Sequence, residues 1–197
     1  MNIIQDAEPA PNRDFTARLA HRLRAEREAR GWPLAELAAR SGVSRAMISR
    51  VERGEASPTA ALLGRLSGAF GLTLSALLAR AEEDVAGRLL RAADQPAWLD
   101  PATRYRRRAL TPPGAEPELV EVTLPPATRV PFPAASYAFL RGQCLWVIEG
   151  TLDFAEGGTL HHLNEGDCLA LGPPADCAFV NPSSDTPCRY LVALARR

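Results

Sequence analysis

Residues 34–53 of the chain read LAELAARSGVSRAMISRVER. Two short helical patterns meet in this stretch, and Gly42 stands between them, where the chain needs a residue that takes a positive φ angle. Ala38 is small enough to let two helices cross, and Ile48 and Val51 supply apolar anchors for the second helix. The spacing predicts a helix-turn-helix.

Burial of those anchors leaves one set of side chains of the second helix and its cap pointing outward: Ser44, Arg45, Ala46, Ser49 and Arg50. The outward face of such a helix meets base edges in the major groove of DNA. An arginine there can hold guanine through two hydrogen bonds, which contributes ~1–3 kcal/mol of discrimination. We therefore expect double-stranded DNA as a partner.

The helical period continues on both sides of this stretch, from Phe15 to about Arg80. Five short helices are expected, the fourth beginning at Ser57–Pro58 with the serine as N-cap. The sequence predicts four regions: a flexible arm over residues 1–14, a helix-turn-helix DNA-binding domain over 15–80, a linker over 81–105 and a β-domain over 106–197.

The net charge of zero hides an asymmetry between the two halves. Residues 13–80 hold twelve arginines and six acidic residues, a net charge of +6, whereas residues 109–195 hold three arginines and ten acidic residues, a net charge of −7. A basic front suits a polyanion such as DNA. The arginines at 104–108 are interpreted as the solvated edge of the linker, with DNA contact as the alternative.

The block from Leu19 to Leu78 resembles the XRE family of lambda-repressor-like helix-turn-helix regulators. The resemblance implies that Arg45 and Arg50 read bases and that Ser44, Ser49 and Arg53 lie near phosphates or bases. With Ala46 from the outward set, these are the expected DNA-binding residues. Because one such domain covers half a site, we expect a homodimer on a near-palindromic operator, with half-sites about one helical turn (~34 Å) apart.

The same resemblance implies a structural ion pair between Arg27 and Glu52. One position departs from the family pattern, since Pro33 stands where a serine or threonine commonly caps the second helix, three residues before Glu36. Loss of that cap costs about 1 kcal/mol of stability. We expect it to leave function unaffected.

After Arg106 the pattern changes to short β-like runs separated by turn residues. The predicted strands are 119–124, 143–149, 151–154, 168–171, 177–180 and 189–194. Six or more strands at this spacing indicate a barrel or sandwich. The fold class is therefore multidomain, α plus β.

Two segments of this half, GQCLWVIEGTLDF (142–154) and GDCLALGPPADCAFVN (166–181), resemble the two motifs of the cupin family. The resemblance implies a jelly-roll (double-stranded β-helix) barrel. Cupin enzymes usually hold a divalent metal, and this chain departs from their ligand pattern. The glutamate position is Gln143, the last histidine position is Cys177, and the His-x-His pair falls on Tyr137 and Phe139 or on Ser136 and Ala138.

The histidines of this half, His161 and His162, are neighbours on one strand and so face opposite sides. We expect them on an exposed hairpin, no metal site and no cofactor. The mouth of the barrel instead carries Tyr137, Phe139, Gln143 and Cys177, which suits a small, partly apolar effector. The alternative is that these side chains fill the core.

The sequence favours a transcriptional regulator controlled by an effector in a metal-free barrel, and not an enzyme. Two alternatives stay open: a metal-independent, isomerase-like cupin enzyme with an accessory DNA-binding domain, and a barrel that only dimerises. All four cysteines lie late in the chain and are expected as reduced thiols. No secretory signal and no membrane-spanning run is evident, so we expect a cytoplasmic protein.

Overall fold

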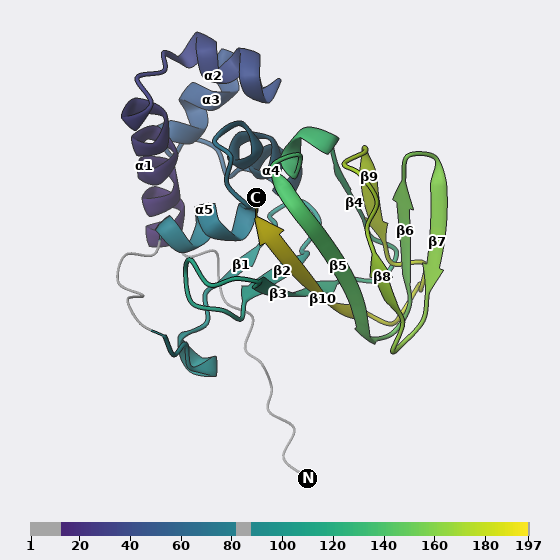
Figure 1. Ribbon diagram of the computed structural model, residues 1–197. Coiled ribbons are helices and arrows are strands. Elements are labelled where there is room, and N and C mark those ends of the chain that lie inside the picture. The colour runs from purple at the N-terminus through teal and green to yellow at the C-terminus, as the bar shows by residue number, and fades with distance from the viewer. Residues whose placement is uncertain (1–12, 82–87, 197) are drawn as a thin grey trace.

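The computed structural model describes residues 13–81 and 88–196, in which a bundle of helices lies beside two antiparallel β-sheets (Figure 1). The helices are α1 (Arg13–Ala29), α2 (Leu34–Ser41), α3 (Arg45–Glu52), α4 (Ala60–Ala69) and α5 (Leu74–Ala81). Two short 3-10 turns follow, η1 (Ala92–Asp94) and η2 (Ala134–Ser136). The five predicted helices are confirmed. Residues 1–12 of the predicted arm lie outside the described residues, and α1 begins at Arg13.

The turn between α2 and α3 forms as the sequence predicts. Gly42 takes a φ angle of 67°, and its N–H donates to the carbonyl of Ala38 at 2.9 Å, which ends α2. The Ser44 hydroxyl accepts from the Met47 N–H at 3.2 Å and so caps α3. Pro33 precedes α2 without a side-chain cap, as expected.

The predicted start of the fourth helix at Ser57–Pro58 is wrong. Helix α4 begins at Ala60, and its N-cap is Thr59, whose hydroxyl accepts from the N–H three residues later at 3.4 Å. The start is fixed from outside the bundle, because the buried carboxylate of Asp100 accepts the Ala60 N–H at 2.7 Å. A carboxylate at this end of a helix accepts a hydrogen bond from an otherwise unpaired N–H and interacts favourably with the positive end of the helix dipole.

No single helix in the described ranges is both long and apolar enough to cross a membrane. Helices α4 and α5 reach the required length and composition only as a pair, which is bent by 92° between them.

The described strands form two packed sheets (Figure 1). Sheet A has the order β1-β2-β3-β10-β5-β8, and sheet B has the order β4-β9-β6-β7. The bounds are β1 (Ala97–Leu99), β2 (Arg106–Ala109), β3 (Glu118–Leu124), β4 (Arg129–Phe132), β5 (Leu140–Glu149), β6 (Leu152–Glu156), β7 (Thr159–Leu163), β8 (Cys168–Ala170), β9 (Cys177–Val180) and β10 (Cys188–Arg196). From β3 to β10 this is the strand order of a jelly roll, which confirms the predicted β architecture as two facing sheets.

Three strands were not evident from the sequence: β1, β2 and β4. Strand β7 was expected only as the hairpin strand that carries His161 and His162. Strand β1 lies inside the segment predicted as a linker and pairs with β2, so residues 97–99 extend sheet A. Strand β2 reads RRRA and β4 contains Pro131, so neither shows the alternation of polar and apolar residues that marks a half-buried strand. Residues 82–87 of the predicted linker lie outside the described residues.

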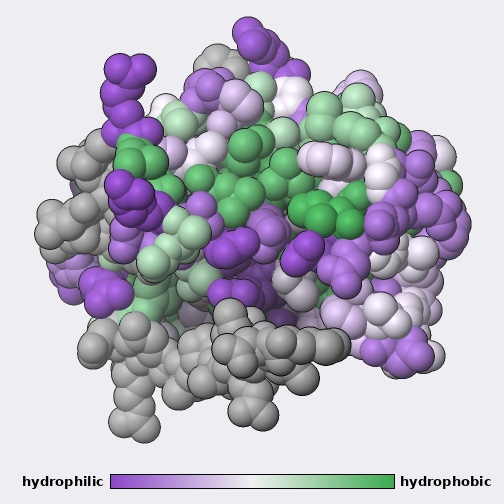
Figure 2. All heavy atoms as spheres, turned by 90° about the horizontal axis from the view of Figure 1, so that it is seen from below, coloured by the Kyte–Doolittle hydropathy of each residue, from purple (hydrophilic) through white to green (hydrophobic). Residues whose placement is uncertain are grey.

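The core of the β-domain follows from alternation along its strands. In β3, Val120, Val122 and Leu124 are fully buried, and the residues between them face outward. On the outer face of sheet A, Trp146 is 50% exposed and lies opposite Cys168 in the register. Figure 2, seen from below, shows apolar side chains gathered near the middle of one side of the molecule, with polar groups around them.

The bundle and the β-domain meet where α4 packs on η2 and β4. A β-carbon at Gly64 would lie 2.9 Å from the Phe132 ring, and one at Gly68 would lie 2.4 Å from the backbone oxygen of Ala135. Only glycine permits this approach, because real β-carbons essentially never come within 3.0 Å of another heavy atom. We call this contact region, with the polar bonds described next, the seam.

Polar bonds join the two parts along the seam. The Thr73 hydroxyl donates to the buried Glu118 carboxylate, with 2.8 Å to each oxygen. On the neighbouring strand, Arg107 donates to the Ser75 hydroxyl of α5 at 2.7 Å. The Asp100 cap on α4 is a third such bond. Buried hydrogen bonds of this kind fix one arrangement of the two parts, since leaving either partner unpaired is costly.

The interpretation of residues 104–108 as a solvated linker edge is wrong for β2. Arg107 donates to the buried Tyr105 hydroxyl at 2.8 Å, and Arg108 pairs with Glu121 at 2.8 Å; both arginine side chains are partly buried. Because residues 106–108 are consecutive arginines, the sequence shows no alternation of polar and apolar residues that would indicate a strand packed beneath α5.

One buried carboxylate ties the bundle together. Glu26 accepts hydrogen bonds from Arg22 at 2.6 Å, Arg30 at 2.6 Å and Arg80 at 2.9 Å, and so links α1 to α5. Burial acts to raise the pKa of Glu26, but hydrogen bonds from Arg30, Arg80 and Arg22 outweigh it and lower the pKa to about 2. The ionised carboxylate therefore stabilises the folded bundle.

We predict that Gly68→Ala lowers the free energy of unfolding by about 1–3 kcal/mol, because its new methyl group collides with backbone at Ala135. In a helix without this contact, the same change would stabilise by up to ~1 kcal/mol. Urea unfolding measures the difference. The matched control is Gly142→Ala, whose β-carbon meets nothing within 4 Å. Equal stability of the Gly68→Ala variant and the wild type would contradict the close approach.

We also predict that Glu26→Gln lowers the free energy of unfolding by about 3 kcal/mol at pH 7. The folded-state pKa of about 2 lies below the ordinary value of 4.5, so the contribution is complete above about pH 4.5 and disappears as the pH falls towards 2. Unfolding curves between pH 2 and pH 7 should converge for wild type and variant at the acid end. Glu28→Gln, at an exposed position of the same helix, is the control; parallel curves for Glu26→Gln and wild type would refute the prediction.

Candidate nucleic-acid interface and ligand cavity

Helix α3 is held to the bundle by its apolar side. Ile48 and Val51 are each 1% exposed and belong to the core of the bundle. With that side fixed, the opposite side of α3 and its Ser44 cap must face solvent. The structure therefore presents one short, rigid helix at an outer surface of the bundle (Figure 1).

The six residues expected to bind DNA lie together on this exposed side. Ser49 is partly buried. The other five are exposed: Ser44, Arg45, Ala46, Arg50 and Arg53. The side chains of Arg45 and Arg50 form no hydrogen bond or ion pair with any described residue. Their guanidinium groups keep their full set of donors for an external partner.

Arg53 is engaged within the protein. It forms two hydrogen bonds with Glu55, at 2.6 and 2.8 Å, and a third with the Ser49 hydroxyl. The hydrogen bond with Glu55 raises the pKa of Arg53. Arg53 must exchange these partners before it can contact a phosphate or a base, which distinguishes it from Arg45 and Arg50.

The expected ion pair between Arg27 and Glu52 is confirmed. Two bonds of 2.8 Å join the guanidinium to the carboxylate, and Arg27 also donates to the Trp32 carbonyl at 2.9 Å. Hydrogen bonding to Glu52 raises the pKa of Arg27. The pair joins the C-terminal end of α3 to α1 and so fixes the direction of α3.

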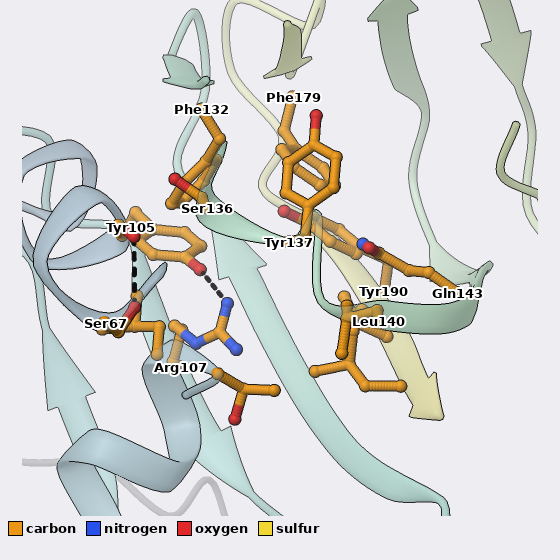
Figure 3. A pocket seen from close by; sticks show the side chains of 15 residues that line it. Ser67, Tyr105, Arg107, Phe132, Ser136, Tyr137, Leu140, Gln143, Phe179 and Tyr190 are labelled. Atoms are coloured by element: carbon orange, nitrogen blue, oxygen red, sulfur yellow. Dashed lines mark hydrogen bonds between the residues drawn. The ribbon is translucent and has the colours of Figure 1, made fainter. Parts of the chain in front are cut away.

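A small cavity lies on the seam, between α4 and α5 on one side and the open end of the β-domain on the other (Figure 3). Its volume is about 60 Å³. Both parts of the molecule line it: Gly64, Ser67, Thr73, Leu74, Tyr105, Arg107, Phe132, Ser136, Tyr137, Leu140, Gln143, Phe179, Tyr190, Val192 and Leu194. The space is far below the ~300 Å³ of an ordinary ligand pocket.

The structure brings together two of the four residues expected at the barrel mouth. Tyr137 and Gln143 line the cavity; in Figure 3 the Gln143 side chain points inward, whereas the Tyr137 hydroxyl points away from Arg107. Phe139 packs against the core away from the cavity. Cys177 lines a separate open groove of about 340 Å³ between α4 and sheet B, where Arg65 and Arg129 also lie.

Neither Tyr137 nor Cys177 is prepared for acid–base or nucleophilic chemistry at neutral pH. Burial raises the pKa of the Cys177 thiol to about 11, and a hydrogen bond with Tyr137 offsets this only in part. Burial also raises the pKa of Tyr137, whose hydroxyl donates to the Ala175 carbonyl. A protonated thiol is a weak nucleophile and a weak metal ligand.

Sequence reasoning missed Arg107 at the cavity and placed Ser136 only in an alternative alignment. Arg107 reaches the cavity because β2 turns it inward beneath α5, and the run of arginines around it concealed that alternation. Ser136 lies in η2 directly after Pro133, in a segment without β or helical periodicity. The cupin alignment was the one signal for Ser136.

The positions that hold a metal in cupin enzymes do not fit one here. They carry Gln143, Cys177 and uncharged residues between 136 and 139, and within the described ranges no group of three His, Cys, Asp or Glu side chains is placed to bind an ion. His161 and His162 lie on β7 as expected, and contact Glu156 and Asp153 respectively. These two histidines face different sides of the strand.

Comparison with known proteins agrees with this geometry. Residues 23–77 match the helix-turn-helix family model HTH_3. The chain carries an HTH_3 domain. Over 60 residues, the sequence is 38% identical to the HTH-type transcriptional regulator SutR of Escherichia coli K12; this covers 30% of the chain and 34% of SutR. The matched segment thus spans about a third of that relative.

A solved structure shows the same fold over nearly the whole chain. A crystal structure of an HTH_3 family transcriptional regulator from Vibrio cholerae matches with a TM-score of 0.75 at 21% identity, and covers 94% of this chain and 99% of that one. A cupin_2 domain of an XRE family regulator from Enterobacter cloacae matches with a TM-score of 0.42 at 16% identity, over 47% of this chain and 97% of that one. The strand order, and not this second similarity, carries the jelly-roll assignment.

We predict that Glu52→Gln destabilises the HTH_3 domain by about 3 kcal/mol, because it leaves the guanidinium of Arg27, 12% exposed, without its counter-charge. Thermal unfolding followed by circular dichroism measures the loss. Glu36→Gln removes an exposed ion pair with Arg40 and serves as the control, with a much smaller effect. If both variants lose the same small amount, the pair does not brace α3.

Proposed function

We propose that the protein is a sequence-specific DNA-binding transcriptional regulator whose α3 reads the major groove. The observation that carries this proposal is the pair Arg45 and Arg50, both exposed, on a helix that Ile48 and Val51 fix to the bundle. Neither guanidinium group forms a hydrogen bond or an ion pair with another described residue. The similarity of residues 23–77 to HTH_3 domains supports the same use of α3.

These side chains suit both parts of DNA recognition. A guanidinium can donate two hydrogen bonds to guanine O6 and N7, and it can also neutralise a phosphate. Ser44, Ser49 and Ala46 surround the two arginines and supply short side chains that let the helix enter the groove. Arg53 joins after it exchanges Glu55 for a phosphate, a substitution of one anion for another.

We propose that the regulator acts as a homodimer on a near-palindromic operator, because one α3 covers only half a site. The outer face of sheet A is suited to be the contact surface between the two copies. It exposes Trp146, Cys144 and Cys168 on adjacent strands, and Trp146 is half exposed. Large exposed apolar side chains grouped on one face mark contact surfaces.

We further propose that a small effector bound in the metal-free β-domain of this cytoplasmic regulator controls operator affinity. Tyr137 and Gln143, which line the cavity, support this role; the other two residues expected at the pocket lie outside the cavity, Phe139 against the core and Cys177 in the separate groove. We favour a regulator over an enzyme because the described lining of the cavity offers no histidine, aspartate or glutamate to act as a general base.

We predict that the double variant Arg45→Gln/Arg50→Gln binds an operator at least about 30-fold more weakly, since each arginine contributes ~1–3 kcal/mol and ~2 kcal/mol corresponds to about 30-fold. The operator is first selected in vitro from random duplexes with wild-type protein. Fluorescence anisotropy over a series of salt concentrations then gives affinity and salt slope, and the slope should fall by up to about 2.

Arg129→Gln is the matched control, with the same charge change at an exposed position of the β-domain. It should retain operator affinity. A folded double variant that binds the operator as tightly as the Arg129→Gln control would refute the regulator assignment.

A further inference from the structure

Two polar groups on the wall of the seam cavity have no partner of their own. Ser136 is 8% exposed, and its hydroxyl oxygen makes no hydrogen bond within the described part of the chain. The Nε of Arg107 is likewise buried and unbonded there. Because buried polar groups in native proteins are nearly always hydrogen-bonded, both point to a partner outside the described residues.

Among the described residues, the guanidinium of Arg107 also has no counter-charge. It donates to two neutral hydroxyls, those of Tyr105 at 2.8 Å and Ser75 at 2.7 Å. No carboxylate of residues 13–81 or 88–196 pairs with it, and none lines the cavity. A partly buried positive charge with spare N–H donors is a binding site for an anion, above all for a planar carboxylate.

The size of the cavity limits the ligand. About 60 Å³ accommodates a molecule of roughly five non-hydrogen atoms, next to the apolar walls of Leu140 and Val192. Arg107 and Ser136 lie apart on the wall in Figure 3, with the Tyr105 ring between them. A ligand that satisfies both therefore needs two polar ends.

We propose that the cavity binds a small monocarboxylate with a second polar group, such as a short hydroxy acid. Its carboxylate accepts hydrogen bonds from Arg107, and its second group pairs with the Ser136 hydroxyl. The inference rests on the proposed function, for which it names the ligand class and the route of control.

The position of these two residues couples the ligand to the DNA-binding bundle. Arg107 already holds α5 through Ser75, and Ser136 lies in η2, which packs against α4 at Gly68. A ligand that redirects both contacts changes how the bundle sits on the β-domain. The coupling expected between two such sites is about 10-fold in operator affinity.

Isothermal titration of the full chain with glycolate tests the site, with ionic strength held constant by chloride. We expect saturable binding in roughly the millimolar range or tighter, given only five non-hydrogen atoms. Glycolamide, which is neutral, should not bind. Acetate, which lacks the hydroxyl, should bind more weakly than glycolate.

Variants separate the two contacts. Arg107→Gln should weaken glycolate and acetate at least 10-fold, whereas Ser136→Ala should weaken glycolate and leave acetate unchanged. The Ser136→Ala variant folds, because it removes a group with no described partner. If Arg107→Gln disturbs folding, Arg107→Lys replaces it in the titrations, because lysine keeps the positive charge. Arg108→Gln, on the same strand and paired with Glu121 away from the cavity, is the control and should bind as wild type.

Anisotropy of the selected operator, with and without saturating glycolate, tests the coupling. A shift of about 10-fold that disappears in Arg107→Gln supports the inference. Absence of saturable glycolate binding, equal binding by Arg107→Gln and Arg108→Gln, or an operator affinity that ignores bound glycolate overturns it while DNA binding stands. Failure of the proposed function, by contrast, appears as operator affinity that is unchanged in the Arg45→Gln/Arg50→Gln variant. It does not alter glycolate binding in the titration.

Discussion

The contact between α4 and η2 determines how the rest of the molecule is arranged. Gly64 and Gly68 leave the surface of α4 bare, so that Phe132 and the backbone of η2 lie directly on the helix. Without this approach, the helical bundle and the β-domain would be two bodies on a linker. With it, they share one seam, and the seam contains the cavity.

The seam gives α3 a defined position relative to the β-domain. The chain of contact runs from η2 through α4 to the core of the bundle, and from there to α3 through Ile48, Val51 and the Arg27–Glu52 pair. Packed cores of this kind change between discrete arrangements and do not deform continuously. This is the path along which the proposed ligand would act on α3.

The helices and the face of α3 could be predicted from sequence because their determinants are local. Gly42, Ser44 and the spacing of Ile48 and Val51 fix the turn and the outward residues within about ten positions. The six strands with clear alternation were also recognisable. The fold class followed from these two patterns, and the strand order of sheets A and B agrees with it.

What could not be predicted depends on contacts between distant residues. The start of α4 is set by Asp100, forty positions away, and the cavity joins α4 and α5 to strands that follow them by up to about 120 residues. Arg107 looked like one charge in a run, since only the pairing of β2 with β3 turns it towards α5. The four candidate pocket residues therefore lie in three places: the cavity, the core and the separate groove.

The Asp100 carboxylate accepts hydrogen bonds from two segments of the chain. One oxygen accepts the first N–H of α4, and the other accepts the N–H and hydroxyl of Thr103 in its own turn. A helix of the DNA-binding unit is thus completed by a residue that belongs to the other half of the chain. Grafted onto an unrelated partner domain, the N-terminal unit would lose the terminal anion of α4, at a cost of about 1 kcal/mol of stability.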